Sequence, residues 1–531
     1  MPEVTPADVQ QLRDDELREL VARLCAAELS RVGLSASGVT SGGAQDEPDG
    51  GIDVRVSAEG PFAAGGWIPR RDTGFQVKVP TMPPKAVVAE MRPGGELRPS
   101  IADLAERDGA YVIVSAKASL TDARLALTTK AMRHAIEGIP AQGQLATDFY
   151  DRDRLARWVN TFPGVAAWVL RTIGRAAEGW SPPEGLTADP PGAPLITADD
   201  CLLVDGRANG GALPLADGIA RMRAALSEPK AALRLVGLSG LGKTRLVQAL
   251  FEPDVGTGAL DRAVGLYADQ AAEPVPSPRR MAADLVRAGT RCILVIDNCT
   301  PETHRALSET CRGQSSNVSL LTVEYDVRDD EPEGTEVFRL EPAPDVVIQR
   351  MLERRAPDLA DPDRRRIADF AGGNFRIALA LADTVERGRG LGTLTNAELF
   401  ERLFRQRRAE DPSLADAARA LALAYSFDGE DASEGSELAT LATIAGQRAA
   451  ELFRASAELE ARGLVQKRSR WRAVLPHAVA NRLAAECLRR TPFETLEAAL
   501  HKVGSERLLK SAARRIGFLH ESAEARALAK R

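Results

Sequence analysis

The sequence predicts a multidomain α/β protein whose C-terminal part is mostly helical. Two observations predict this class: alternating strand patterns in the first 115 residues, and regular alternation of strand and helix patterns after residue 195. A third observation concerns organisation. Residues 179–194 are so rich in Pro and Gly that they cannot lie inside a regular element, and they predict a linker between domains. From about Asp345 onward the pattern is nearly all helical.

The composition is that of a globular protein and excludes several other classes. The chain has 531 residues, of which 44% are hydrophobic, and its net charge of −6 shows no overall basic bias toward nucleic acid. The six cysteines form no CxxC pair, which is typical of free thiols in a reducing compartment. The N-terminus is acidic, and no run of about 18 apolar residues occurs. We therefore expect a cytoplasmic protein without a membrane partner.

Three strands are predicted in the N-terminal part. Apolar and polar residues alternate over 51–56 and again over 75–79, as expected for half-buried strands with one polar face. Residues 111–114 are apolar on both faces, which favours a central strand. The predicted order of elements is helix, strand, strand, strand, helix.

A glycine-rich segment predicts a nucleotide site. Gly237, Gly240, Gly242, Lys243 and Thr244 belong to a segment that fits GxxxxGK[ST], with a strand before it and a helix after it. Glycines let backbone amides turn inward and hold phosphates at a helix N-terminus, the lysine reaches the β- and γ-phosphates, and the threonine binds Mg²⁺. The alternative, a glycine-rich turn without function, does not explain the flanking strand and helix.

A second acidic strand is expected to complete the nucleotide site. Residues 292–296 are apolar and end at Asp297, which places a carboxylate for Mg²⁺ at the C-terminal edge of the sheet. The next residue is Asn298, where hydrolytic P-loop proteins often carry a second acid. Because asparagine cannot act as a base, we expect slow hydrolysis and a nucleotide-holding switch.

A second candidate site lies in the N-terminal part. Asp53 follows two glycines, and Gln76 and Lys78 occupy alternate positions of a later predicted strand. If these strands are neighbours, the three polar groups share one face. Asp53 and Gln76 then offer oxygen ligands to Mg²⁺, and Lys78 orients or deprotonates water, as metal-dependent phosphodiester cleavage requires. An inactive domain with an exposed polar strand face is the alternative.

Glu28 is a fourth candidate for this site. The first helix carries an apolar stripe from Leu17 to Leu24, and Glu28 continues that stripe one turn later. An acid on a packed face needs a partner, which favours a functional role. The alternative is that Glu28 lies at the fraying end of the helix and reaches water.

The segments after the P-loop resemble those of the STAND class of NB-ARC and NACHT signalling ATPases. The resemblance spans roughly residues 195–490 and includes the segments 320–324, 337–342, 371–378 and 475–478. It implies ATP as the nucleotide and His477 as a contact to bound ADP, although a histidine on a helix face is also possible. Phe375 replaces the proline of the family's GxP-like segment, and Glu324 stands where the family has an arginine, for which Arg328 is a weak substitute.

The N-terminal set resembles the Mrr-like branch of the PD-(D/E)xK nucleases. That resemblance covers about residues 10–160 and rests on a helix Glu, then GGID, then QxK. It implies a restriction-endonuclease-like α/β/α domain that cuts double-stranded DNA with Mg²⁺. The expected domains are a nuclease domain (1–178), a linker (179–195), a doubly wound P-loop NTPase domain (196–342), a helical domain (343–408), a winged-helix domain (409–490) and C-terminal helices (491–531).

Together the two resemblances imply an antiviral STAND protein. A trigger protein would drive nucleotide exchange and homo-oligomer assembly, and the clustered nucleases would then cut DNA. Two alternatives stay open. One is an ATP-dependent Mrr-type restriction endonuclease. The other is a STAND-type transcription regulator with an inert N-terminal domain, for which the basic run 466–472 would contact DNA, although such a run is also typical of a solvated hairpin.

Overall fold

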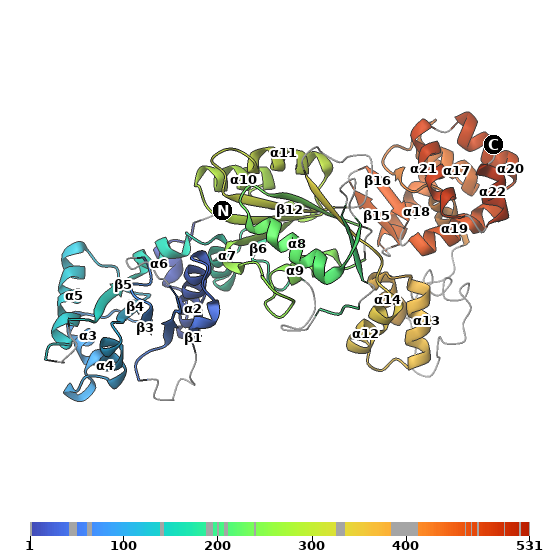
Figure 1. The fold of residues 1–531 in the computed structure, drawn as a ribbon. Helices are drawn as coiled ribbons and strands as arrows, with labels where there is room; N and C mark the ends of the chain where they lie inside the picture. Colours follow the sequence, from blue (N-terminus) through green and yellow to red (C-terminus); the bar gives the residue numbers. More distant parts are fainter. Residues whose placement is uncertain are drawn as a thin grey trace. The chain divides into compact units, whose positions relative to one another are not determined.

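Figure 1 shows the computed structural model of the chain. The chain divides into two compact units. One unit is formed by Met1–Pro191, Met222–Leu233 and Val247–Thr322, and the other by Gly192–Arg221, Arg234–Leu246 and Val323–Arg531. None of the helices in the described residues combines the length and apolar character that crossing a bilayer requires. The structure describes residues 3–41, 50–60, 66–138, 143–186, 195–198, 201–205, 211–237, 240–324, 335–383, 412–461, 464–468, 470–474, 477–503, 505–519 and 522–529.

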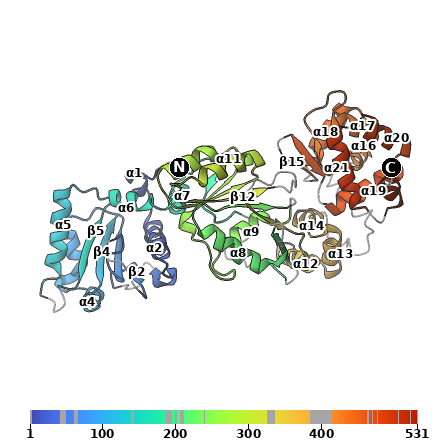
Figure 2. The same cartoon turned by 45° about the horizontal axis from the view of Figure 1, so that its top comes forward.

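The N-terminal part of the first unit contains a five-stranded sheet (Figure 2). Its strands are paired in sequence order, with antiparallel pairing up to the third strand and parallel pairing beyond it. The strands are β1 (Val39–Ser41), β2 (Val54–Ser57), β3 (Asp72–Lys78), β4 (Ala110–Ser115) and β5 (Ala146–Tyr150).

Helices cover both faces of this sheet, because side chains of successive strand residues point to opposite faces. Phe75 and Val77 pack with helices α1, α2, α6 and α7, whereas Tyr111 and Ile113 pack with α3, α4 and α5. The result is an α/β/α arrangement with two separate cores. The sequence predicted α2, β2, β3, β4 and one later helix, and the structure adds α1, β1, α3, α4, β5 and further helices after β4. The helices are α1 (Pro6–Val9), α2 (Asp14–Arg31), α3 (Pro84–Met91), α4 (Pro99–Glu106), α5 (Asp122–Ala135), α6 (Arg152–Val159) and α7 (Pro163–Thr172).

An eight-stranded sheet holds the glycine-rich segment. The strand order is β6-β10-β11-β12-β9-β13-β7-β8, and β10, β11 and β12 are parallel. Runs of Val, Ile and Leu buried on both faces form these central strands, as parallel sheets covered by helices require. The strands are β6 (Trp180–Ser181), β7 (Leu202–Asp205), β8 (Ala212–Pro214), β9 (Ala232–Val236), β10 (Gly265–Asp269), β11 (Cys292–Asp297), β12 (Val318–Glu324) and β13 (Glu336–Leu340).

Helices follow the strands of this sheet in the alternation that the sequence predicted, which confirms the mixed α/β class. The helix after the glycine-rich segment, α9, is fixed at its C-terminal end by the buried Arg223. The Arg223 guanidinium donates hydrogen bonds to five backbone carbonyls of the segment 249–257, which satisfies acceptors that a helix end leaves unpaired. The helices are α8 (Leu215–Ser227), α9 (Lys243–Leu250), α10 (Pro278–Arg287) and α11 (Pro301–Cys311).

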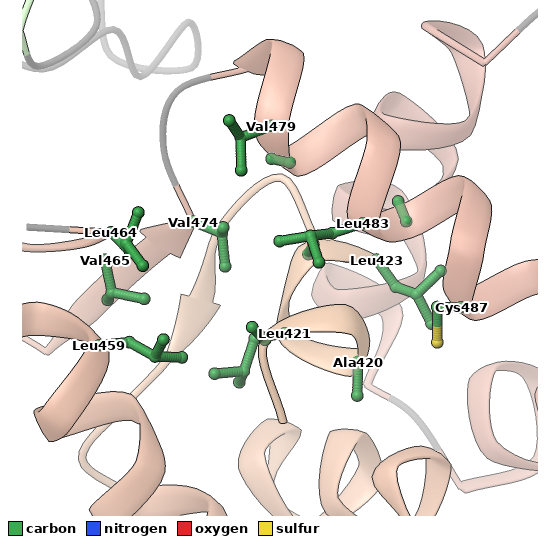
Figure 3. Packing of buried hydrophobic residues seen from close by; sticks show 14 of the residues in the cluster. Ala420, Leu421, Leu423, Leu459, Leu464, Val465, Val474, Val479, Leu483 and Cys487 are labelled. Atoms are coloured by element: carbon green, nitrogen blue, oxygen red, sulfur yellow. The ribbon is translucent and has the colours of Figure 1, made fainter. Parts of the chain in front are cut away.

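The C-terminal part is mostly helical, as predicted, and shares one apolar core (Figure 3). Leu421, Leu459, Val474 and Leu483 meet there from helices and from an antiparallel hairpin formed by β15 and β16. The elements are α12 (Asp345–Arg355), α13 (Asp361–Ala371), α14 (Phe375–Ala382), α16 (Pro412–Ala422), β14 (Phe427–Asp428), α17 (Glu437–Ala445), α18 (Ala449–Ala461), β15 (Val465–Arg468), β16 (Trp471–Val474), α19 (His477–Arg490), α20 (Phe493–Glu497), α21 (Glu506–Gly517) and α22 (Ala523–Ala529).

Candidate functional site

The glycine-rich segment connects the C-terminal end of β9 to the N-terminus of α9. Gly237, Gly240 and Gly242 have φ angles of +146°, +83° and +91°, which side chains rarely adopt. Lys243 is the first residue of α9 and Thr244 the second. The motif residues 238–239 lie outside the described residues. A strand, a turn with positive-φ glycines and a helix, in this order, are what a P-loop requires, in which backbone amides face an anion at the helix N-terminus.

Lys243 lies against the strand end that precedes it. Its side chain is buried, and Nζ donates a hydrogen bond of 2.6 Å to the carbonyl oxygen of Gly237. The ammonium group is therefore held beside the P-loop backbone. A phosphate at the helix N-terminus would find both the lysine and the backbone amides within the same small region.

A loop from the helical part of the same unit packs on the P-loop. Phe375 N donates a hydrogen bond of 2.9 Å to Gly240 O, and Asn374 caps α14 by accepting from Ile377 N at 3.1 Å. A Cβ on Gly240 would collide with the Asn374 amide, and the Phe375 ring lies in ordinary contact range of Gly242. Phe375 thus packs against the P-loop at the position where the resembled family carries proline.

A buried ion pair joins β9, the strand before the P-loop, to the end of β12. The Arg234 guanidinium on β9 donates to Glu324 Oε2 at the end of β12, with an Nε–Oε2 distance of 3.1 Å and a second bond from Nη2. Both side chains are almost fully excluded from solvent. Glu324 therefore carries its own counter-charge, and Arg328, the substitute considered from the sequence, lies outside the described residues.

In the first unit, Asp297 ends β11 as predicted, and two donors fix its carboxylate. Tyr267 OH donates to Oδ2 at 3.0 Å, and Asn298 N donates to Oδ1 at 2.7 Å. Burial and the neighbouring Asp297 carboxylate raise the pKa of the Tyr267 hydroxyl, so it stays a donor. Asn298 has a φ of +53° and donates from Nδ2 to Asp269 Oδ1 at 2.8 Å, so its amide is directed to the neighbouring strand.

His477 is the first residue of α19, directly after the hairpin of β15 and β16. Its side chain and residues 475–476 lie outside the described residues. Its contact to a nucleotide stays a prediction.

The second candidate site brings Asp53 and Gln76 together. Gln76 Nε2 and Val77 N each donate to Asp53 Oδ2 at 2.7 Å. Both side chains are buried. Because the carboxylate only accepts, the Gln76 amide must direct its nitrogen to Asp53, and its oxygen then accepts no hydrogen bond from any described residue. A buried amide oxygen without a partner beside a buried carboxylate fits a Mg²⁺ site in donor type. The part of the chain that the structure describes has no cluster of three or more His, Cys, Asp or Glu residues suited to a metal.

Lys78 is on the same strand as Gln76 and pairs with a helix acid. Its Nζ lies 3.3 Å from Glu90 Oε1, and Arg98 Nη2 lies 2.9 Å from the same oxygen. The Lys78 side chain is partly exposed. Lys78 is therefore a solvent-accessible ammonium that Glu90 holds in place.

Glu28 is positioned differently from what the sequence suggested. Its carboxylate accepts from Trp158 Nε1 at 3.0 Å and from Arg31 Nε at 3.0 Å. Trp158 packs with Phe75 in the core on one face of the sheet, whereas Gln76 points to the other face. The partner that a buried acid needs is supplied by Trp158 and Arg31, and a catalytic role of Glu28 stays a prediction.

Sequence reasoning missed four residues that position these groups: Arg18, Glu90, Asn374 and Tyr267. Arg18 and Glu90 left no motif, because each acts on a partner more than ten residues away. Tyr267 carried a weak signal, since it is a polar side chain near the end of a strand parallel to β11.

Comparison with known proteins finds structural neighbours of this chain but does not identify a family. No family model and no curated protein matches this chain. The chain is similar to a STAND protein (Signal Transduction ATPase with Numerous Domains) with a tetratricopeptide repeat sensor from Pyrococcus horikoshii, at 13% identity and a TM-score of 0.26. That match covers 58% of this chain, and this chain spans about half, 54%, of the neighbour's length.

Two further structural neighbours match at similarly low identity. One is the Thermotoga maritima RuvB Holliday junction branch migration motor, at 16% identity, a TM-score of 0.29, and coverage of 49% of this chain and 92% of that one. The other is Brucella abortus NtrX in complex with ADP, at 14% identity, a TM-score of 0.24, and coverage of 73% and 98%. Structural similarities this weak do not support an argument about function. The argument about function therefore rests on the residues of the chain itself.

Proposed function

We propose that this protein is a nucleotide-switched, Mg²⁺-dependent DNA endonuclease of prokaryotic antiphage defence. The nucleotide-binding part of the proposal rests on the P-loop backbone, in which three glycines have positive φ angles and Lys243 begins α9. In this proposal Lys243 and the backbone amides hold the phosphates of ATP, and Thr244 and Asp297 hold Mg²⁺. Asn298 offers no base, and its amide bonds to Asp269, which favours slow hydrolysis and a switch.

The nuclease part rests on the Asp53–Gln76 pair. Mg²⁺ bound there would polarise a phosphodiester oxygen and stabilise charge on the leaving group. Asp53 and Gln76 would hold the metal, and Lys78, kept in place by Glu90, would orient the attacking water. To act as the base, Lys78 would first have to release its own proton and then accept one from the water. Double-stranded DNA is the proposed substrate, and Glu28 remains a candidate that supports the site from the helix.

The switch part rests on the loop that packs on the P-loop. Phosphate binding and the Phe375–Gly240 hydrogen bond involve the same backbone segment, so nucleotide state can act on the helical region. We propose that a trigger protein favours ATP exchange, that His477 contacts bound ADP from the winged-helix region 409–490, and that the chain then forms a homo-oligomer in the cytoplasm. Assembly raises the local concentration of nuclease domains on DNA.

A plasmid-cleavage assay with Mg²⁺ and ATP tests this proposal, with protein concentration varied so that assembly can occur. Wild-type protein is expected to cut, and Asp53→Ala and Lys243→Ala are expected to fail. Lys510→Ala, an exposed lysine paired with Glu506, is the matched control. Cutting that survives Lys243→Ala would mean that nucleotide binding at the P-loop is not required for cleavage.

A second candidate, a DNA-binding transcription regulator, is favoured by one feature of the hairpin. Trp471 is partly exposed on β16, and the guanidinium carbons of Arg470 and Arg507 lie 5.4 Å and 4.1 Å from its ring. An exposed aromatic ring between two arginines can stack on a base or contact phosphates. DNA binding that is lost on Trp471→Ala, in a protein that never cuts DNA, would favour this candidate.

A further inference from the structure

An arginine lies at the carboxylate that the proposed nuclease site needs for its metal. Arg18 on α2 places Nε 3.1 Å from Asp53 Oδ1, while Asp53 Oδ2 accepts from Gln76 and Val77. The Asp53 side chain is only 1% exposed, and Arg18 is 28% exposed. The contact with the carboxylate is buried, whereas the rest of the Arg18 side chain keeps part of its surface exposed.

A buried carboxylate needs one compensating positive charge, and Arg18 supplies it. A divalent cation would supply the same compensation at the same oxygen. The two positive groups cannot share Oδ1 without strong repulsion in a site from which water is largely excluded. Arg18 and a metal ion are therefore competitors for Asp53.

Arg18 also has a second partner that does not involve Asp53. Its Nη2 lies 2.9 Å from Asp14 Oδ2, one helical turn earlier and nearer to solvent. Rotation of the flexible arginine side chain can break the contact with Asp53 and keep the contact with Asp14. When Arg18 moves away from Asp53 in this way, it loses one of its two ion pairs and keeps the other. The unpartnered Gln76 oxygen remains beside the carboxylate as a ready oxygen ligand.

We propose that Arg18 is a built-in counter-ion that closes the Asp53–Gln76 site to divalent cations, and that turning Arg18 to Asp14 opens it. This inference rests on the proposed nuclease function and deepens it. It gives the N-terminal domain an inactive ground state of its own, and an isolated chain is then a poor nuclease even where Mg²⁺ is abundant. Assembly of several chains favours the open state, in which Arg18 has left Asp53. DNA phosphates, which attract the guanidinium, favour the same state.

Mn²⁺ binding to the full chain, measured by calorimetry without nucleotide, tests the inference. Arg18→Gln is expected to bind Mn²⁺ at least about tenfold more tightly than wild type, and Arg18→Gln with Asp53→Asn is expected to lose that binding. Arg13→Gln removes the same charge from an exposed pair on the same helix end and is expected to leave binding unchanged. Asp14→Asn removes the alternative partner, so it is expected to weaken Mn²⁺ binding several-fold.

The outcomes separate the inference from the function it rests on. Equal Mn²⁺ affinity in wild type and Arg18→Gln, lost in both on Asp53→Asn, would keep the metal site and overturn the role of Arg18. No Mn²⁺ binding in any variant, with Arg18→Gln shown to be folded by thermal unfolding, would overturn both. If Arg18→Gln does not fold, Asp14→Asn decides, because its change is at a partly exposed position and unchanged affinity there contradicts the inference.

Discussion

The buried ion pair behind the P-loop strand gives a quantitative prediction about stability. The side chains of Arg234 and Glu324 are only 3% and 2% exposed, so water cannot compensate either charge when its partner is removed. Breaking such a pair costs about 3–5 kcal/mol, because a buried charge loses a counter-charge that water does not replace. Arg234→Met is therefore expected to lower the unfolding free energy of the nucleotide-binding unit by about 3–5 kcal/mol. Replacing both partners, as Arg234→Met with Glu324→Leu, is expected to cost much less.

Urea unfolding monitored by loss of ATP binding measures these changes in the unit that carries the P-loop. Arg448→Met breaks an exposed pair with Glu451 of α18 in the same unit and is the matched control, with little expected cost because water screens both charges. A cost below about 1 kcal/mol for Arg234→Met, or a double variant as unstable as the single one, would refute the reasoning. Either result would mean that the pair is solvated or that its charges are not coupled.

Three further predictions concern residues that position the nucleotide fold. Tyr267→Phe removes the 3.0 Å hydrogen bond to Asp297. It is expected to weaken the binding of Mg²⁺–ATP about threefold to tenfold, as measured by calorimetry. An unchanged affinity would contradict this prediction. Arg223→Met removes five hydrogen bonds to backbone carbonyls of the segment 249–257. It is expected to lower the unfolding free energy by about 3 kcal/mol, as measured by thermal unfolding. A loss below about 1 kcal/mol would show that water replaces the guanidinium. Burial raises the pKa of Asp261 to about 6. The folded state therefore holds a proton that the unfolded state has released, and stability falls as pH rises from about 4 to 6, by about 1.4 kcal/mol per pH unit. Asp261→Asn is expected to flatten that part of the stability profile, and an unchanged slope would exclude Asp261 as its cause.

Much of the fold was predictable because its signals are local. The alternation over residues 75–79 and the apolar runs at residues 111–114 and 292–296 each predicted a strand within about three residues of its observed ends. The basic run 466–472, for which a solvated hairpin was one interpretation, lies in the hairpin of β15 and β16. Where glycines and apolar periodicity fix the backbone, the sequence alone is sufficient.

The contacts that tune the sites were not predictable, because they join residues distant in sequence. Asp53 was predicted inside a strand and lies one residue before β2 begins at Val54. Arg18 of α2 contacts its carboxylate there, and no local pattern indicates that contact. Glu28 was predicted to support catalysis because an acid on an apolar stripe needs a partner. One partner is Arg31, which lies on the same helix three residues later. The other is Trp158, 130 residues further along the chain, and no local pattern indicates it.

The central claim, that ATP binds at the P-loop and needs Lys243, is tested most directly by calorimetric titration of ATP with Mg²⁺. The account predicts one ATP per chain for wild type and for the Lys510→Ala control, and an affinity at least about a hundredfold weaker for Lys243→Ala, because that lysine carries the charge that faces the phosphates. Full ATP affinity in Lys243→Ala, or no ATP binding by folded wild type, would contradict it.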